Sequence, residues 1–127
     1  AAEKTHETIR KKIWGYAKDE NLTMKQLLRE EYQGIRPAVG YPSLPDMSVS
    51  FLLAELLDME GIGIRLTENG MMQPHASVCG LMFAHPASRY FSVGKIDGEQ
   101  LADYARRRGY SLETMKKFLA GNIESAS

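Results

Sequence analysis

The chain has 127 residues, 43% of them hydrophobic, and its 16 basic and 16 acidic side chains cancel at neutral pH. This length fits one domain or part of one, and the composition is normal for a soluble globular protein. A balanced charge does not indicate a polyanion-binding surface, so we expect no nucleic-acid partner. With the single cysteine, Cys79, no internal disulfide can form, which favours a reducing compartment. The apolar runs are too short to span a bilayer and no signal peptide is apparent, so we expect a cytoplasmic protein with no membrane partner.

The first two predicted elements are helices. Apolar side chains at Ile9, Ile13 and Tyr16 follow helical spacing and predict a helix over residues 3–18. Thr23 and Gln26 fit a capping box, in which each side chain satisfies the other residue's free backbone amide, and this predicts a second helix start. The next proline ends any helical continuation, because proline disfavours the α conformation in the residue before it.

A third helix is expected after residue 46. Asp46 or Ser48 can cap it, and its apolar residues form one wide face, so we expect a largely buried helix. They are Val49, Phe51, Leu52, Leu53, Leu56, Leu57 and Met59.

Three β-strands are expected in the middle of the chain. Alternation of Ile62, Ile64 and Leu66 predicts a strand over 62–66 with one solvent-facing side, followed by a turn at 67–70. Residues 77–84 and 90–96 are rich in strand formers and read as a hairpin closed by the loop 85–89.

Two C-terminal helices follow. Asp97 is expected to cap the first, which ends at Gly109, and Ser111 the second, which ends at Gly121. The predicted fold class is therefore α+β, with a small antiparallel sheet flanked by helices. Because three strands are few for an independent sheet, we expect the chain to be part of a larger domain.

The stretch GIRPAVGYPSLPD, residues 34–46, contains three of the five prolines and two glycines. Such a loop is readily held in one shape, and long ordered loops are often functional. Arg36 offers a planar guanidinium suited to a carboxylate or phosphate, and Tyr41 offers a flat face and a hydroxyl. Backbone at Gly40 allows close approach of a small zwitterionic or nucleotide-like ligand. The alternative is a rigid crossover in which Arg36 pairs with a neighbouring carboxylate.

Conventional catalytic and metal motifs are not found. The three histidines and Cys79 lack metal-ligand spacing, and His75 and His85 are more readily explained as polar loop residues. The arginines at 106–108 stand in the last turn of a helix, where cations are favourable, and a solvated helix end is the simpler interpretation.

Three segments together carry a family resemblance. ENLTMKQLLREEYQGIRPAVGYPSLPD (20–46), LTENGMMQPHASVCGLMFAHPASRYFSVGKI (66–96) and LADYARRRGYSLETMKKFLAGNI (101–123) occur in this order. They include Arg-Pro-Ala-x-Gly-Tyr-Pro and His-Pro-x-Ser-x-Tyr. This arrangement resembles the C-terminal part of the activation domain of cobalamin-dependent methionine synthase.

The resemblance implies a function. That family moves methyl from methyltetrahydrofolate to homocysteine, and its activation domain binds S-adenosylmethionine. When cobalamin is oxidised to cob(II)alamin, an electron from a flavoprotein and a methyl group from S-adenosylmethionine restore methylcobalamin. The implied partners are the cobalamin-binding domain of the same enzyme and the flavoprotein electron donor. The protein mainly positions the reactants, so no catalytic acid or base and no metal site of its own is expected.

The motif match also implies binding residues. Arg36, Ala38 and Gly40 fall on family positions that contact S-adenosylmethionine. Tyr90 falls on another such position with Phe91 beside it, and Tyr41 is expected near the cobalamin. Arg36 can pair bidentately with the methionine carboxylate, and aromatic faces suit the adenine ring and the sulfonium.

The chain is much shorter than the family domain, so residues 1–127 are expected to be a C-terminal fragment with an incomplete site. We expect the fragment to bind S-adenosylmethionine weakly or not at all and to self-associate. Two other classes of function stay open. One is a non-catalytic module that binds an adenosyl ligand or nucleotide. The other is an interaction domain that docks a cobalamin domain or flavoprotein.

Overall fold

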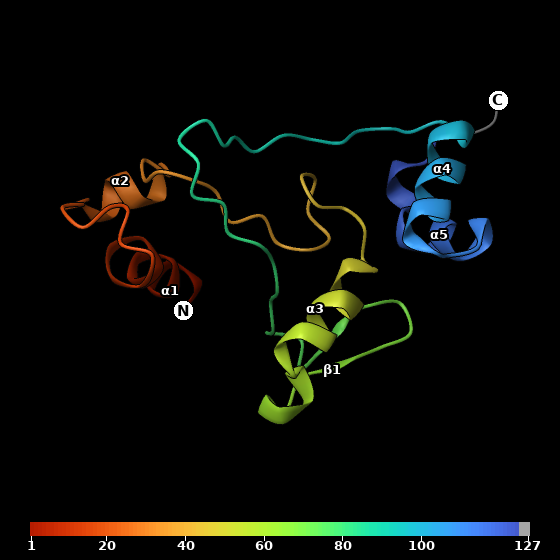
Figure 1. Ribbon diagram of the computed structural model, residues 1–127, viewed down its shortest axis with the longest axis horizontal. Helices are drawn as coiled ribbons and strands as arrows, with labels where there is room; N and C mark the ends of the chain where they lie inside the picture. The colour runs from red at the N-terminus through yellow and green to blue at the C-terminus, as the bar shows by residue number, and fades with distance from the viewer. Residues whose placement is uncertain (125–127) are drawn as a thin grey trace. The chain divides into compact units, whose positions relative to one another are not determined.

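The computed structural model describes residues 1–124 and shows helices, long irregular segments and one small antiparallel sheet (Figure 1). The α+β class predicted from the sequence is confirmed. The chain divides into two compact units. The first contains Ala1–Arg36 and Leu81–Tyr90, and the second contains Pro37–Gly80 and the residues from Phe91 onward.

The first unit is built on α1 (Ala2–Thr8), its continuation as a π-helix (Ile9–Ile13), and α2 (Met24–Leu28). The helical part ends about one turn before the predicted residue 18, with Gly15 at a φ of 70°. The capping box of Thr23 and Gln26 is present, as predicted. Buried residues of this unit include Leu27, Tyr32 and Ile35, together with two polar side chains, His6 and Arg10.

The second unit begins with the loop after Arg36 and continues into α3 (Val49–Leu57) and a 3₁₀ turn (Met59–Ile62). Asp46 accepts a hydrogen bond from the backbone N–H of Ser48 at 2.8 Å, just before the helix. The prediction of a largely buried α3 is wrong, because Leu52, Leu56 and Leu57 are all exposed.

The sheet is smaller than predicted and partly in another place. β1 (Arg65–Leu66) pairs with β2 (Met72–Gln73) across the predicted turn at 67–70. The predicted strands 77–84 and 90–96 are wrong, since these segments form only isolated bridges. Ile35 pairs with Phe83 and Ala38 pairs with Gly80, but Pro37 between them has no N–H group to donate, so the two bridges do not join into a continuous ladder.

The last helices agree with the sequence. α4 (Gly98–Arg108) starts with a capping box between Asp97 and Gln100 and ends at Gly109 in a left-handed conformation. α5 (Leu112–Phe118) is capped by Ser111, and a 3₁₀ turn (Ala120–Asn122) follows it. The two helices lie side by side in Figure 1. Their shared core consists of Leu101, Ala105, Met115, Phe118 and Leu119.

Candidate functional site

Arg36 is held in the first unit by two side chains of α1. Its Nη2 donates to Glu3 Oε2 at 2.7 Å, and its Nη1 lies 3.1 Å from His6 Nδ1. The guanidinium carbon also lies 5.3 Å from the centre of the Tyr32 ring. Glu3 raises the pKa of Arg36, and Arg36 lowers that of Glu3. The structure therefore contains the carboxylate pairing that the sequence left open for Arg36.

His6 is neutral in this cluster. Arginine has no hydrogen-bond acceptor, so His6 Nδ1 must accept from Arg36 and the ring proton must be on Nε2. Burial, followed by the charges of Arg10 and Arg36, lowers the pKa of His6 to about 4. Arg10 itself is fully buried and forms two 2.8 Å bonds with Glu20. The two arginines are thus each paired with one carboxylate, Arg10 with Glu20 and Arg36 with Glu3, and these pairs hold Arg36 in place.

Tyr90 contacts the backbone of Arg36. Its hydroxyl accepts a 2.9 Å hydrogen bond from the backbone N–H of Arg36, although 54 positions separate them in sequence. Two residues that the motif assigned to ligand binding are thus brought together within one unit. The hydroxyl proton of Tyr90 is not used by this bond.

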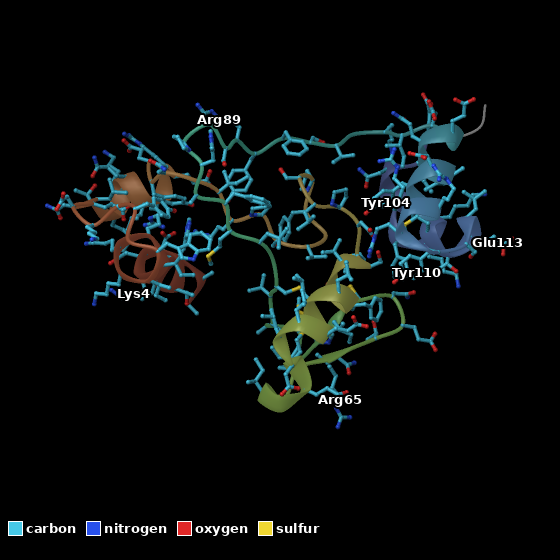
Figure 2. The ribbon with its side chains drawn as sticks, in the orientation of Figure 1. Lys4, Arg65, Arg89, Tyr104, Tyr110 and Glu113 are labelled. Carbon is cyan, nitrogen blue, oxygen red and sulfur yellow. The ribbon has the colours of Figure 1, made fainter. Side chains whose placement is uncertain are left out.

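A cavity of about 250 Å³ lies beside this contact in the first unit. Its walls carry one carboxylate, Glu30, and one guanidinium, Arg89, on the loop 85–90 (Figure 2). Nη1 of Arg89 donates to the carbonyls of Pro86 and Ser88, at 3.2 and 2.9 Å. The full lining is Glu30, Tyr32, Gln33, Gly34, Ile35, Pro86, Ser88, Arg89 and Tyr90.

Sequence reasoning missed Glu30, Tyr32 and Arg89. Glu30 has a φ of 57°, a left-handed conformation that a residue other than glycine rarely adopts. Only glycine, asparagine or aspartate would have signalled that conformation in the sequence. Tyr32 lies within the segment quoted for the family resemblance, but its ring is covered by Arg10, which is far from it in sequence, as well as by the nearby Arg36.

The second unit contains the remaining motif residues. Ala38 pairs with Gly80, and a Cβ on Gly80 would lie 2.4 Å from the carbonyl oxygen of Pro37. Gly40 has a φ of 96° and donates its N–H to Leu44 at 2.8 Å. The proline- and glycine-rich loop is therefore closely held, and the glycines are required by close backbone approach.

Tyr41 and Phe91 both expose their rings, at 66% and 61%. Ser43 fixes the chain at Phe91, because its hydroxyl donates to the Phe91 carbonyl and accepts from the Phe91 N–H at 2.9 Å. A cavity of about 360 Å³ in this unit includes Gly40 and Tyr41 but not Phe91. It is lined by Gly40, Tyr41, Pro42, Pro45, Ser92, Gly94, Lys95, Gly121 and Asn122.

Asp46 anchors the end of the loop to α4. The hydroxyl of Tyr104 donates to Asp46 Oδ2 at 2.5 Å, and Arg108 lies 3.5 Å from the same oxygen (Tyr104 is labelled in Figure 2). Arg108 also donates to Ser48 Oγ at 2.9 Å. The expected solvated helix end holds for Arg106 and Arg107, which pair with Asp103 at the surface, but not for Arg108.

Comparison with known proteins identifies the family. The sequence profile described as "Vitamin B12 dependent methionine synthase, activation domain" matches residues 1–109. The chain belongs to this family. Family membership confirms the resemblance carried by the motifs at 36–42 and 85–90.

A solved structure described as "Crystal Structure of the MetH Reactivation Domain bound to AdoHcy" is similar to this chain. The two sequences are 46% identical, and the structures superpose with a TM-score of 0.93. The match covers 98% of this chain but only 39% of the other chain. This chain therefore spans less than half the length of the protein it resembles.

Residues 1–124 contain neither a metal-binding cluster nor a membrane-spanning helix. Within that range no group of three or more histidine, cysteine, aspartate or glutamate side chains could hold a metal ion. No helix in the same range is long and apolar enough to cross a membrane.

Proposed function

We propose that this chain binds S-adenosylmethionine as the C-terminal part of an activation domain in cobalamin-dependent methionine synthase. The ligand would supply the methyl group for reductive remethylation of cobalamin, which a neighbouring domain of the enzyme holds. A flavoprotein would supply the electron. The methyltransferase activity belongs to the whole enzyme, and the chain's own contribution is to bind and orient the methyl donor.

The observation that carries this proposal is the cavity beside the Arg36–Tyr90 contact. S-adenosylmethionine has a carboxylate, an ammonium group, a sulfonium and an adenine ring. The cavity wall has a carboxylate at Glu30 for the cationic groups and an aromatic ring at Tyr90 for adenine or the sulfonium. The crystallised relative was solved with AdoHcy, which differs from S-adenosylmethionine by the transferred methyl group.

Arg36 is the proposed partner of the ligand carboxylate. Its contacts with Glu3 and His6 use one N–H of each terminal nitrogen, and a guanidinium has five N–H groups. Donors therefore remain for a second carboxylate. A charged hydrogen bond of this kind is worth about 1.5–3 kcal/mol, or roughly ten- to a hundredfold in affinity.

Ala38, Gly40, Tyr41 and Phe91 complete the proposed contacts. The held backbone at Ala38 and Gly40 suits close approach of the ligand, and the exposed ring of Tyr41 suits contact with cobalamin. The motif match supports these roles.

Titration calorimetry on the full-length protein tests the proposal. We expect S-adenosylmethionine and S-adenosylhomocysteine to bind, and Arg36→Ala to weaken both. In the complete enzyme this variant should slow reactivation, while turnover of already methylated cobalamin stays near normal. Unchanged affinity with reduced thermal stability would instead make Arg36 purely structural.

A docking function is the second candidate, favoured by the exposed rings of Tyr41 and Phe91. Pull-down with the cobalamin-binding domain, with and without S-adenosylmethionine, separates the two. Capture that does not depend on the ligand, with no heat of ligand binding, would favour docking alone.

A further inference from the structure

The cavity of about 360 Å³ in the second unit has walls from three separate segments of the chain. Val93 donates its backbone N–H to the Pro42 carbonyl at 3.0 Å, which joins the second of these segments to the first. Ser43 joins the same two segments through its hydrogen bonds with Phe91. The walls are therefore fixed by the chain's own hydrogen bonds. The three segments are 40–45 of the proline- and glycine-rich loop, 92–95, and 121–122 at the 3₁₀ turn after α5.

The second and third segments are joined by two side chains of the cavity wall. Lys95 Nζ donates to the Gly121 carbonyl at 2.8 Å, and Asn122 Nδ2 donates to the Gly94 carbonyl at 2.8 Å. All four of these residues line the cavity, so the two side chains run along its surface. The ammonium of Lys95 is thus held at the wall by a neutral carbonyl oxygen.

Lys95 gives this cavity a positive charge. The other described residues of the lining are glycines, prolines, a serine, a tyrosine and an asparagine. No carboxylate among residues 1–124 forms an ion pair with Lys95. An ammonium has three N–H donors, and the bond with Gly121 uses one of them. Donors therefore remain for an oxygen acceptor, and the cavity attracts such groups and repels cations.

Tyr41 adds a flat apolar surface to the same cavity. Its ring is 66% exposed, and its loop is closed by the 2.8 Å bond from the Gly40 N–H to the Leu44 carbonyl. An exposed aromatic ring beside a positive donor suits a large flat molecule with oxygen acceptors at its edge. Cobalamin has this chemistry, because amide side chains and one phosphodiester surround its corrin ring. S-adenosylmethionine fits less well, because its sulfonium and ammonium find no carboxylate here, whereas the first unit's cavity offers Glu30.

We propose that Lys95 is a binding residue for cobalamin, whose ammonium donates a hydrogen bond to an oxygen at the edge of the corrin, next to Tyr41. This inference rests on the proposed function, in which a neighbouring domain of the enzyme holds the cobalamin. It adds a residue outside the motifs at 36–42 and 85–90. The acceptor is an oxygen of an amide side chain or of the phosphodiester, and the experiment distinguishes the two.

The test measures how fast an amine-acylating reagent modifies Lys95 in the full-length protein, with S-adenosylhomocysteine present and mass spectrometry as the readout. Three forms are compared: cobalamin-free, loaded with cobalamin, and loaded with cobinamide, which keeps the corrin amides but lacks the phosphate. Absorbance confirms the loading. We expect cobalamin to slow the acylation of Lys95 about tenfold, which a charged hydrogen bond of ordinary strength supplies. Equal slowing by cobinamide assigns the acceptor to an amide, and slowing by cobalamin alone assigns it to the phosphate.

Lys117 is the matched control, because it is an exposed lysine of α5 in the same unit and does not line this cavity. Its acylation rate should not depend on cobalamin. If S-adenosylhomocysteine binds but cobalamin leaves the rate at Lys95 unchanged, whether fast or slow, this inference is overturned and the proposed function stands. Equal slowing of Lys117 would show that the protection is not local to the cavity, and would overturn the inference as well. If S-adenosylhomocysteine does not bind and cobalamin protects neither lysine, both fail.

Discussion

Arg36 Nη2 and Glu3 Oε2 lie 2.7 Å apart, which joins the first helix of the chain to the start of its family motif. The side chains of Arg36 and Glu3 are 23% and 36% exposed, so the pair is neither fully buried nor freely solvated. The Arg36 guanidinium, which we propose as the partner of the ligand carboxylate, therefore already pairs with the carboxylate of Glu3. In the proposed complex the ligand carboxylate and Glu3 would share one cation, and Glu3 would set how strongly that cation attracts the ligand.

The first prediction concerns Glu3→Gln. Glutamine can still accept a hydrogen bond from Arg36 but removes the negative charge. We expect S-adenosylhomocysteine affinity to rise a few-fold, because the ligand carboxylate no longer shares the charge of Arg36. Folding stability should fall by no more than about 1 kcal/mol, which is typical of partly exposed ion pairs.

Glu7→Gln is a control on the same helix, since among residues 1–124 Glu7 pairs only with the exposed Lys4, at 3.4 Å. It should change neither affinity nor stability measurably. A loss of affinity in Glu3→Gln would contradict the sharing argument, and would mean that Glu3 chiefly holds Arg36 in its binding position.

The second prediction is a pH dependence from His6. Its pKa is about 4 in the folded protein and 6.5 without burial, so the unfolded chain binds more protons between these values. Stability is therefore greatest above pH 6.5 and falls as the pH is lowered toward 4. His6 alone accounts for a loss of up to about 3 kcal/mol.

Urea denaturation of wild type and His6→Gln at pH 7, 5.5 and 4.5 checks this. Glutamine offers an acceptor to Arg36 but does not titrate, so its stability should depend less on pH. The carboxylate of Glu3 acts in a lower window, because Arg36 depresses its pKa below 4.5. If the free energy of unfolding changed equally with pH in the two proteins between pH 7 and 4.5, His6 would not be the source of the pH dependence.

Local signals predicted the ends of the chain's best-formed helix. Asp97 and Gln100 form their capping box, and Gly109 ends α4 in the left-handed conformation, because these features depend on residues only three or four positions apart. The turn at 67–70 was likewise predictable from its own residues.

The wrong predictions, namely the strands at 77–84 and 90–96 and the burial of α3, concern features that depend on distant parts of the chain. Residues 77–84 have the composition of a strand, but a strand needs a continuous partner, and the segment opposite contains Pro37. The wide apolar face of α3 predicted burial, yet periodicity does not show whether another segment is there to cover Leu56.

The contacts around Arg36 could be predicted from the sequence only in part. The motif match named Arg36 and Tyr90, and the structure joins these two by a hydrogen bond. It did not name Glu3 or His6, which reach Arg36 from 33 and 30 positions away. Contacts at that separation depend on how the helices fold back, which no local pattern encodes.

The third prediction concerns Asp46, which is 4% exposed and bound by Tyr104 and Arg108. Asp46→Ala leaves the partly buried Arg108 charge without its counter-ion. We expect the free energy of unfolding to fall by about 3–5 kcal/mol, as measured when one partner of a buried pair is removed. Tyr104→Phe removes one hydrogen bond and should cost about 1–3 kcal/mol.

Asp103→Ala supplies the comparison for α4. Its pairs with Arg106 and Arg107 are exposed, so we expect a change within about 1 kcal/mol. Denaturant unfolding measures all three variants. If Asp46→Ala were as stable as Asp103→Ala, the loop after Arg36 would not be anchored through this network.

The fourth prediction is that the isolated 127 residues self-associate through α3. Leu56 and Leu57 are 79% and 63% exposed on a helix whose only charged residue is Glu55, and such a surface is a common site of association. Sedimentation should show an average mass that rises with protein concentration. Leu56→Lys should lower that mass, because a charge would be buried in the contact. Leu28→Lys, at an equally exposed leucine of α2, should leave it unchanged. A chain that stays monomeric at every concentration, or two variants that behave alike, would exclude α3 as the contact.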